Sequence, residues 1–318
     1  MSKFSKHPLQ SKEWATFRKE WGNRVIKFKY GYVIATRIPK SKYSVGTFIK
    51  GPEPTKDLLD KLKKVAHKNN LIYIKIEPDY VPKSENTRKR LFKLLKNNGC
   101  VSGKTLFTPS TFIIDLSKSD EDLMKSFSGK TRYNIRLAGR RCVNVTEDNS
   151  DKAFETYLEL TRNTVERQGF YAHSEKYHKL MWKHLRSNKK RPVARLLKAT
   201  FKKEIIATWI LFVGNKTLYY PYGASSHKHK NVMASNLMMW EAIQLGKKLG
   251  LEKFDLWGRE EGKGFTKFKE GYSPIVEEFL GTWDLVTSKL YWPYRVADKL
   301  RWIYLRLKSK SGFVRPSF

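Results

Sequence analysis

The chain has 318 residues and a formal net charge of +34 at pH 7, from 64 Lys and Arg against 30 Asp and Glu. Hydrophobic residues make up 40% and aromatic residues 14%, which excludes a disordered basic tail and is enough for two folded domains. The two cysteines, Cys100 and Cys142, exclude a disulfide framework, and neither stands in a Cys-x-x-Cys metal spacing. The charge indicates a polyanionic partner (nucleic acid, anionic lipid or a phosphate-bearing substrate), although a lysine-rich solvated surface would give the same composition.

The first half of the chain has the pattern of an α/β domain. Apolar residues recur at helical spacing between Leu58 and Ala66, and Gly31, Pro39 and Gly51-Pro52 separate the runs of strand-forming residues. The expected elements are, in order, a helix at 14–21 opened by Ser11, strands at 25–30, 32–37 and 43–49, a helix at 55–69, a strand at 71–76, a helix at 85–97, and a strand at 111–116 that closes this half.

The second half begins with an acidic helix start at 117–122, followed by a basic helical segment from Lys125 to Arg141 with a break near Ser128-Gly129. The residues between Gly262 and Tyr272 are expected to form a loop. The other expected elements are a strand at 143–146, helices at 151–168 and 174–187, strands at 193–200, 204–213 and 216–222, a helix at 233–249, and strands at 254–257 and 277–286.

A helix, several antiparallel strands, a helix and a strand form the order of a GNAT-like domain, and the first half has a similar order. The predicted fold class is therefore α/β with mixed sheets, in two tandem GNAT-like domains without a coiled-coil arm. The expected domains are residues 1–117 plus 288–318 for the first and 118–287 for the second.

The segment from Ser288 to Lys308 has the pattern of a separate amphipathic helix. Trp292, Val296, Leu300, Ile303 and Leu307 fall at helical spacing, with basic residues between them. The favoured interpretation is a helix that packs this stripe on the first domain. The alternative is a basic amphipathic helix in peripheral contact with the inner face of the membrane.

Seven short segments stand in a fixed order along the chain: Leu9-Gln10-Ser11-Lys12-Glu13-Trp14 with Arg18, Lys50-Gly51-Pro52, Ile74-Lys75-Ile76-Glu77-Pro78, Lys130-Thr131-Arg132-Tyr133-Asn134-Ile135-Arg136, Tyr219-Tyr220-Pro221-Tyr222-Gly223, Phe254-Asp255-Leu256-Trp257-Gly258 and Gly264-Phe265-Thr266-Lys267-Phe268-Lys269-Glu270-Gly271-Tyr272. Each is weak alone, but the ordered set resembles the Fem family of non-ribosomal aminoacyltransferases over essentially the whole chain. Some members carry a long coiled-coil arm; no heptad insertion is visible here, so the chain resembles the type without an arm.

The resemblance implies an enzyme that takes an amino acid from aminoacyl-tRNA and attaches it to the stem peptide of a peptidoglycan precursor. That muramyl-peptide precursor is either lipid-linked (lipid II) or nucleotide-linked (UDP-MurNAc-pentapeptide). No cofactor and no metal are expected, and the protein is expected to be a monomer. A cytoplasmic location is expected, because the N-terminus lacks the apolar core of a signal peptide and the longest apolar stretch, Ile205–Val213, is about half of a membrane span.

The resemblance gives catalytic roles to Lys269 and to Phe268, which precedes it in the chain. An amine that attacks an aminoacyl ester passes through a tetrahedral oxyanion, and one fixed donor at such an oxygen lowers the barrier by ~2.7–4 kcal/mol. The alternative is that Lys269 is one more surface lysine. Glu77, at a strand end, would position the incoming amine or accept its proton; a helix cap or a salt bridge is the alternative.

Three further residues match positions that hold the precursor in the family. Arg18 replaces a lysine, and its guanidinium can bind a phosphate through two N–H groups. His173 stands where the family can have an arginine, and a cap or packing role is its alternative. Tyr222 could donate its hydroxyl to a phosphate or a peptide carbonyl; otherwise it is a core aromatic at a strand end.

Arg132, Arg136 and Arg140 are spaced four residues apart and, with Lys130, form the densest basic face of the chain. This face is interpreted as a contact with the tRNA backbone, because phosphate binding needs charge and not base readout. The alternative is a solvated face of a very basic protein.

The phosphate-binding turn of CoA-dependent GNAT enzymes is not found, which favours aminoacyl-tRNA as the donor. Two alternatives remain from the sequence. One is a GNAT-like N-acyltransferase with an acyl-CoA or acyl-carrier donor. The other is an inactive double-GNAT module that binds RNA or membrane through its charge, and the Phe268-Lys269 pair argues against it.

Overall fold

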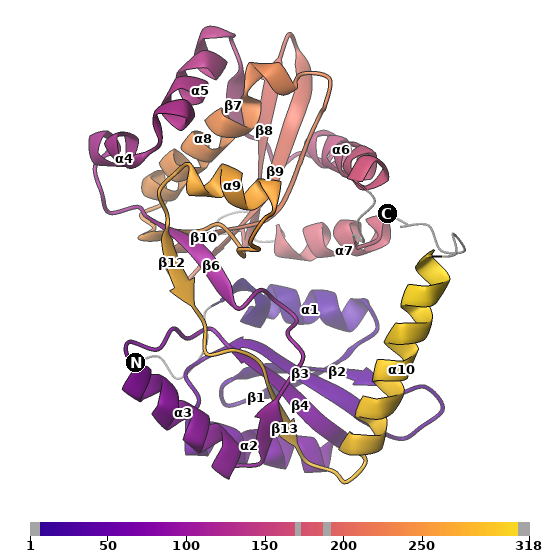
Figure 1. The fold of residues 1–318 in the computed structure, drawn as a ribbon. Coiled ribbons are helices and arrows are strands. Elements are labelled where there is room, and N and C mark those ends of the chain that lie inside the picture. Colours follow the sequence, from indigo (N-terminus) through magenta and orange to yellow (C-terminus); the bar gives the residue numbers. More distant parts are fainter. Residues whose placement is uncertain (1–6, 169–172, 187–191, 311–318) are drawn as a thin grey trace. The chain divides into compact units, whose positions relative to one another are not determined.

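The computed structural model describes residues 7–168, 173–186 and 192–310. The described residues form two compact units (Figure 1). The first unit holds the chain up to Pro109 and resumes at Glu278 with a strand and the C-terminal helix; the second holds Ser110–Glu277. Each unit is built on its own β-sheet.

The sheet of the first unit has six strands in the order β1-β2-β3-β4-β13-β5. Neighbouring strands β3 and β4 are parallel, and the other neighbours are antiparallel. The strands are β1 (Arg24–Phe28), β2 (Gly31–Arg37), β3 (Ser44–Gly51), β4 (Leu71–Pro78), β5 (Cys100–Ser102) and β13 (Trp283–Val286).

The helices of the first unit begin where hydroxyl residues cap them. Ser11, Thr55 and Ser84 each accept a hydrogen bond from the backbone N–H three residues further on, which satisfies a donor that the first turn leaves open. The apolar face of α2, including Leu59 and Leu62, is buried with residues of α3 and the sheet. The helices are η1 (Pro8–Gln10), α1 (Lys12–Glu20), α2 (Lys56–Lys68), α3 (Glu85–Asn97) and α10 (Tyr291–Lys310).

The sheet of the second unit has seven strands in the order β12-β6-β11-β10-β9-β8-β7. Strands β10 and β11 are parallel and pair only from Thr217↔Lys253 to Tyr219↔Asp255. Just beyond this point the pairing of β10 with β9 shifts in register between Tyr219 and Tyr222. The strands are β6 (Ser110–Asp115), β7 (Asn144–Glu147), β8 (Ala194–Phe201), β9 (Glu204–Gly214), β10 (Thr217–Ser225), β11 (Lys253–Asp255) and β12 (Ile275–Glu278).

A large apolar core in the second unit is shared by this sheet and the helices packed on it, with Trp209, Met238 and Phe254 among its buried residues. The helices are α4 (Asp120–Ser126), α5 (Gly129–Arg140), α6 (Asp151–Gln168), α7 (Glu175–Leu185), η2 (Lys230–Val232), α8 (Ala234–Lys248) and α9 (Gly264–Glu270). The expected break near Ser128-Gly129 is confirmed: it separates α4 from α5.

Two expected strands lie in another sheet. The strand at 111–116, expected to close the first half, is β6 and pairs antiparallel with β11 in the second sheet. The single strand expected at 277–286 is two strands, β12 in the second sheet and β13 between β4 and β5 in the first. A strand pattern identifies the strand but not its partner, and both partners here lie far away along the chain.

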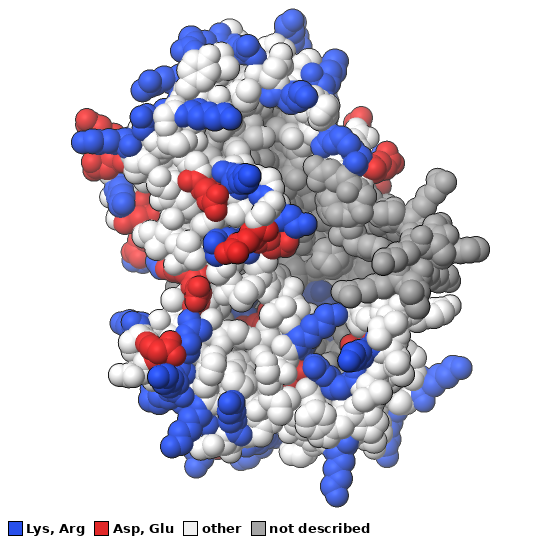
Figure 2. Space-filling view, in the orientation of Figure 1, with Lys and Arg blue, Asp and Glu red and all other residues white. Residues whose placement is uncertain are grey.

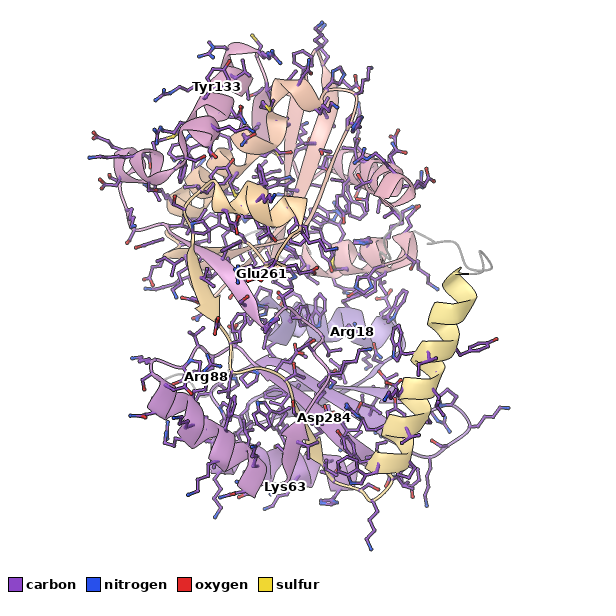
Figure 3. All side chains as sticks on the ribbon, in the orientation of Figure 1. Arg18, Lys63, Arg88, Tyr133, Glu261 and Asp284 are labelled. Carbon is purple, nitrogen blue, oxygen red and sulfur yellow. The ribbon has the colours of Figure 1, made fainter. Side chains whose placement is uncertain are left out.

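The first turns of α10 pack on the sheet of the first unit. Tyr291 is buried and donates its hydroxyl to Asp284 on β13 at 2.9 Å, and Arg295 pairs with the same carboxylate at 3.0 Å. Lys75 on β4 completes this buried cluster at 2.6 Å from Asp284; Asp284 is labelled in Figure 3.

The apolar stripe of this helix does not pack as expected. The exposed fractions of Trp292, Val296 and Leu300 are 62%, 61% and 60%. The expectation was wrong because the packing contacts come from Tyr291, Tyr294 and Arg295, on another face of the helix. Within the described chain, no helix has the length and hydropathy needed to cross a membrane.

Candidate active site

Lys269 lies on α9 (Gly264–Glu270), where the sequence predicted a loop. The loop prediction was wrong because a helix of seven residues is too short to show a periodic pattern. Thr266 in the first turn ties the helix to the preceding segment: its hydroxyl donates to the carbonyl of Glu260 at 2.6 Å and accepts from the N–H of Glu260 at 3.2 Å. The helix therefore fixes the direction in which Lys269 projects.

The side chain of Lys269 is buried, with 6% of the residue exposed. Its Nζ donates to the carbonyls of Gly258 at 2.9 Å and of Trp257 at 3.2 Å. Among the described residues these are the only acceptors that it contacts, so one of its three N–H donors remains for a ligand. The ring of Phe265, which is 45% exposed, lies over Nζ with its centroid 5.0 Å away.

The turn that receives Lys269 is held in an uncommon backbone conformation. Trp257 and Gly258 both have positive φ angles, +58° and +82°. The buried Asp255 accepts hydrogen bonds from the N–H of Trp257 at 2.7 Å and from the hydroxyl of Thr111 at 2.5 Å. The Thr111 oxygen in turn accepts from the N–H of Gly258 at 3.1 Å. These contacts aim two carbonyls at one ammonium group.

Burial lowers the pKa of Lys269 from its ordinary value of 10.5 to about 8, while the charges of Asp255 and Glu260 act in the opposite direction. A pKa near 8 leaves the ammonium form dominant at pH 7, with a proton that it holds less tightly than an exposed lysine does. Such a group can stabilise a developing oxyanion and can also give up a proton.

We expect the substitution Asp255→Asn to lower the pKa of Lys269 further, because it removes the buried negative charge that raises this pKa most while keeping an oxygen acceptor. The titration can be followed by NMR of lysine labelled with carbon-13 at the ε position, with Lys269→Arg to assign the signal. Glu260→Gln is the matched control: Glu260 is exposed, so solvent screens its charge and the shift should be smaller. Equal titration curves for Asp255→Asn and the unmodified protein would contradict this expectation.

Phe268 points to the core and not to the ammonium. It is half-buried, packs against the core of the second unit, and its ring lies 5.5 Å from that of Tyr272. Phe265, which the sequence did not single out, is the aromatic residue beside Lys269. The i, i+4 spacing of Phe265 and Lys269 on one helix was the signal that could have found it.

Tyr222 and His173, expected to bind the precursor, contact the same buried histidine. The ring of Tyr222 lies 5.0 Å from that of His178, and the ring of His173 lies 6.2 Å from it. His173 is exposed and stacks on Tyr177 at 3.9 Å. On its other side, Tyr222 approaches Phe212 at 6.1 Å.

Phe212 also connects this group of rings to the lysine turn. Its ring lies 6.3 Å from that of Trp257, whose carbonyl accepts from Lys269. Three of the predicted residues, Lys269, Tyr222 and His173, therefore belong to one connected set of side chains in the second unit. The set lies where β10 and β11 stop pairing, and irregular strands of this kind are frequent beside active sites.

His178 was missed by the sequence reasoning. It is buried and shares a hydrogen bond with the hydroxyl of Tyr157 at 3.1 Å. Burial, and secondarily the nearby His173, lower the pKa of His178 to about 3, so its ring is neutral at physiological pH. The sequence pattern did not mark it, because Tyr222 and Tyr157, which contact its ring, come from β10 and α6.

Glu77 and Arg18 belong to the first unit. Glu77 is the next-to-last residue of β4 and is buried. Its Oε1 accepts hydrogen bonds from the N–H of Leu106 and from the hydroxyl of Thr282, both at 2.6 Å. The carboxylate therefore joins the segments around residues 106 and 282, and it lines a small cavity with Lys50 and Phe279.

Arg18 lies on α1 (Figure 3). Its Nε donates to Oδ1 of Asn23 at 2.9 Å. This contact holds the guanidinium by one nitrogen, and among the described residues no acceptor engages its two terminal nitrogens. Those two nitrogens are the pair that can bind a phosphate in bidentate fashion.

The four basic residues expected on one face of α5 do not all have the same surroundings. Lys130, Arg136 and Arg140 are exposed. Arg132 is half-buried and donates to the carbonyls of Phe127 and Lys125, so it fastens the start of the helix. Figure 2 shows Lys and Arg side chains gathered over α5 at the top of the view.

Tyr133 adds an aromatic ring to this basic face. It is 56% exposed, and the guanidinium of Arg140 lies 5.7 Å from its ring centroid (Tyr133 is labelled in Figure 3). An exposed aromatic ring among cations is typical of surfaces that bind unpaired nucleotides.

A model of the FemAB family matches residues 1–201 and 184–299. The Lipid II:glycine glycyltransferase of Staphylococcus haemolyticus is 23% identical over 340 residues, which cover 81% of this chain and 81% of that protein. The protein of the same name from Staphylococcus epidermidis is 23% identical over 380 residues, which cover 92% of this chain and 90% of that protein.

A solved structure described as FemX has a similar fold. It superposes with a TM-score of 0.76 at 18% sequence identity, over 87% of this chain and 92% of that chain. The similarity confirms the predicted fold class, a mixed α/β fold with two GNAT-like domains in tandem.

Proposed function

The chain belongs to the FemAB family, and on this premise we propose that it moves an amino acid from aminoacyl-tRNA to the stem peptide of a peptidoglycan precursor. The relatives named Lipid II:glycine glycyltransferase support an acceptor of the muramyl-peptide class, lipid-linked or nucleotide-linked. The donor would be found in the cytoplasm, where we propose that the protein works as a monomer. The aminoacyl ester is already activated, so the reaction needs no further cofactor.

The observation that carries the proposal is the buried ammonium of Lys269 with one N–H donor left for a ligand. The amine of the acceptor forms a C–N bond with the ester carbon, and the carbonyl oxygen becomes an oxyanion. Lys269 would donate to that oxygen in a site with little water, where such a contact is strong. Collapse of the intermediate breaks the C–O bond to the tRNA ribose.

The proton balance of the step needs no external base. The attacking amine loses a proton, and the departing ribose oxygen gains one. Because burial lowers the pKa of Lys269 to about 8, its ammonium can pass a proton to the ribose oxygen and recover one from the amine. Glu77 would help to position the amine, and its two hydrogen bonds at 2.6 Å hold it in place for that role.

We propose acceptor-binding roles for Arg18, Tyr222 and His173. The free terminal nitrogens of Arg18 suit a diphosphate. Tyr222 and His173 share contacts with the neutral ring of His178, which would keep both side chains in place beside the precursor.

The proposal predicts transfer that depends on intact aminoacyl-tRNA. The protein is incubated with mixed radiolabelled aminoacyl-tRNAs and the muramyl pentapeptide precursor, and the stem peptide is analysed by mass spectrometry. We expect a lengthened stem, no product after ribonuclease treatment, and a steep loss of rate with added salt. Turnover with acetyl-CoA and no RNA would replace this proposal by an acyl-CoA-dependent N-acyltransferase.

A further inference from the structure

Helix α10 carries an apolar stripe that the proposed function does not use. With about 100° of rotation per residue, Trp292, Val296, Leu300 and Ile303 share roughly a quarter of the helix circumference. All four are exposed, Ile303 at 46% and the others at about 60% or more. The residues that dock α10 on its own unit, such as Tyr291 and Tyr294, lie roughly on the opposite side.

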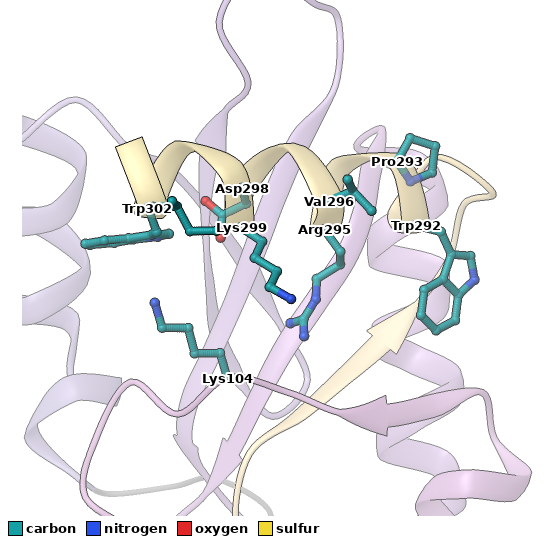
Figure 4. Close-up of a pocket in the computed structure, with 9 residues that line it drawn as sticks. Lys104, Trp292, Pro293, Arg295, Val296, Asp298, Lys299 and Trp302 are labelled. Atoms are coloured by element: carbon teal, nitrogen blue, oxygen red, sulfur yellow. The ribbon is translucent and has the colours of Figure 1, made fainter. Parts of the chain in front are cut away.

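A groove of about 680 Å³ runs along the same helix. In Figure 4, Trp292 and Trp302 lie at its two ends, and the charged groups of Arg295, Lys299 and Lys104 lie between them. The Lys104 ammonium is 4.2 Å from the Trp302 ring centroid. The groove thus combines apolar surface with cations, and Asp298 is the acidic residue in its lining.

The charge of the helix identifies the kind of surface that fits it. Its sequence contains six Lys or Arg residues and one Asp. Exposed Lys299 lies at one border of the apolar stripe, and exposed Lys104 lies with it in the lining of the groove. Apolar residues on one face, basic residues at its borders and tryptophans beside them are typical of a helix that lies in the headgroup region of an anionic bilayer.

We propose that α10 is a peripheral membrane-binding helix, which places its Trp292–Ile303 stripe in the headgroup region of an anionic phospholipid bilayer. The stripe would be inserted only to a depth of about 5–10 Å, parallel to the membrane plane. Lys299 and Lys104 would contact lipid phosphates. The proposal goes beyond aminoacyl transfer and does not depend on it.

The test is flotation of the full chain with lipid vesicles, without tRNA or precursor. We expect binding to vesicles of phosphatidylcholine mixed with phosphatidylglycerol, weak binding to phosphatidylcholine alone, and release at high salt. The double substitution Trp292→Ser and Val296→Ser should weaken binding by about tenfold or more, since it removes two inserted apolar side chains. Lys299→Gln should weaken binding to the anionic vesicles by about fivefold.

Ile275→Ser with Val276→Ser is the matched control. These residues are 56% and 45% exposed on β12, so this pair removes two exposed apolar side chains from another element. We expect it to leave flotation unchanged, and circular dichroism melts should show that both double variants fold. Absence of wild-type binding, or equal binding of the Trp292/Val296 variant, would overturn the proposal. A dimer in light scattering that this variant converts to a monomer would assign the stripe to a second copy instead.

Discussion

Replacing Lys269 with methionine is expected to slow single-turnover transfer by about 100-fold or more, as for the loss of one oxyanion donor. Methionine keeps most of the side-chain volume and removes the charge. The two carbonyls of Trp257 and Gly258 lose their donor, but the positive φ angles of the turn are still held by Asp255 and Thr111. Binding of tRNA and acceptor should change far less than the rate, because the contact strengthens in the transition state.

The burial of Lys269 also makes the stability of the folded protein depend on pH. The folded protein lowers the pKa of Lys269 from 10.5 to about 8, so the buried ammonium destabilises the folded state by roughly 3 kcal/mol at neutral pH. This cost is present in full below pH 8 and is relieved as the pH rises towards 10.5. Lys269→Met should therefore melt at the same or a higher temperature at pH 7 and lose the rise in stability across that range.

Transfer by the unmodified protein should fall as the pH rises through about 8, because the ammonium that stabilises the oxyanion is lost. Quench-flow measurements of single turnovers between pH 6 and pH 9.5 would give this profile. The pH at which the rate falls is expected within about one pH unit of 8. Lys267→Met, a change at an exposed lysine of the same helix, is the control and should keep both the rate and the profile. Near-normal transfer by Lys269→Met would make Lys269 a structural residue of the turn.

Local signals in the sequence predicted most elements of both units. Ser11 marks the start of α1 and the apolar spacing between Leu58 and Ala66 locates α2, since these features act within a few residues. Strand partners are not local. β6 and β13 were identified as strands but given to the wrong sheets, because their ladders form with β11 and β4, far away along the chain.

The candidate site shows the same difference between what local sequence signals predict and what distant contacts decide. The resemblance identified Lys269 and Tyr222, but their settings depend on contacts between distant segments. The burial of Lys269 depends on a turn that Thr111 and Asp255 hold from two strands. His178 became visible only because β10 brings Tyr222 to it. Arg132 shares the spacing of Arg136 and Arg140, and only the carbonyls at the start of α5 separate its role from theirs.

Reversing the charges of Lys130, Arg136 and Arg140 to glutamate is expected to weaken tRNA binding by about 100-fold or more at low salt. Each substitution removes a cation that would displace a counterion from a phosphate and adds a repelling carboxylate. The slope of log affinity against log salt should therefore decrease by about three. Arg132 is kept, because it donates to backbone carbonyls and its loss would damage the start of α5. Filter binding over a salt series, with melting curves as a check of folding, measures both quantities.

The control for this prediction is a triple variant with the same change in net charge on helices of the first unit. Lys64 and Lys68 on α2 and Lys89 on α3 are exposed. If tRNA lies on α5, their reversal to glutamate should reduce affinity only through the long-range field, which salt screens over about 10 Å at 0.1 M. The tRNA affinities of the two triple variants should then differ both at low salt and at moderate salt. Equal losses in both would mean that the net charge and not the α5 face attracts tRNA, and unchanged affinity in the α5 variant would leave this face a solvated surface.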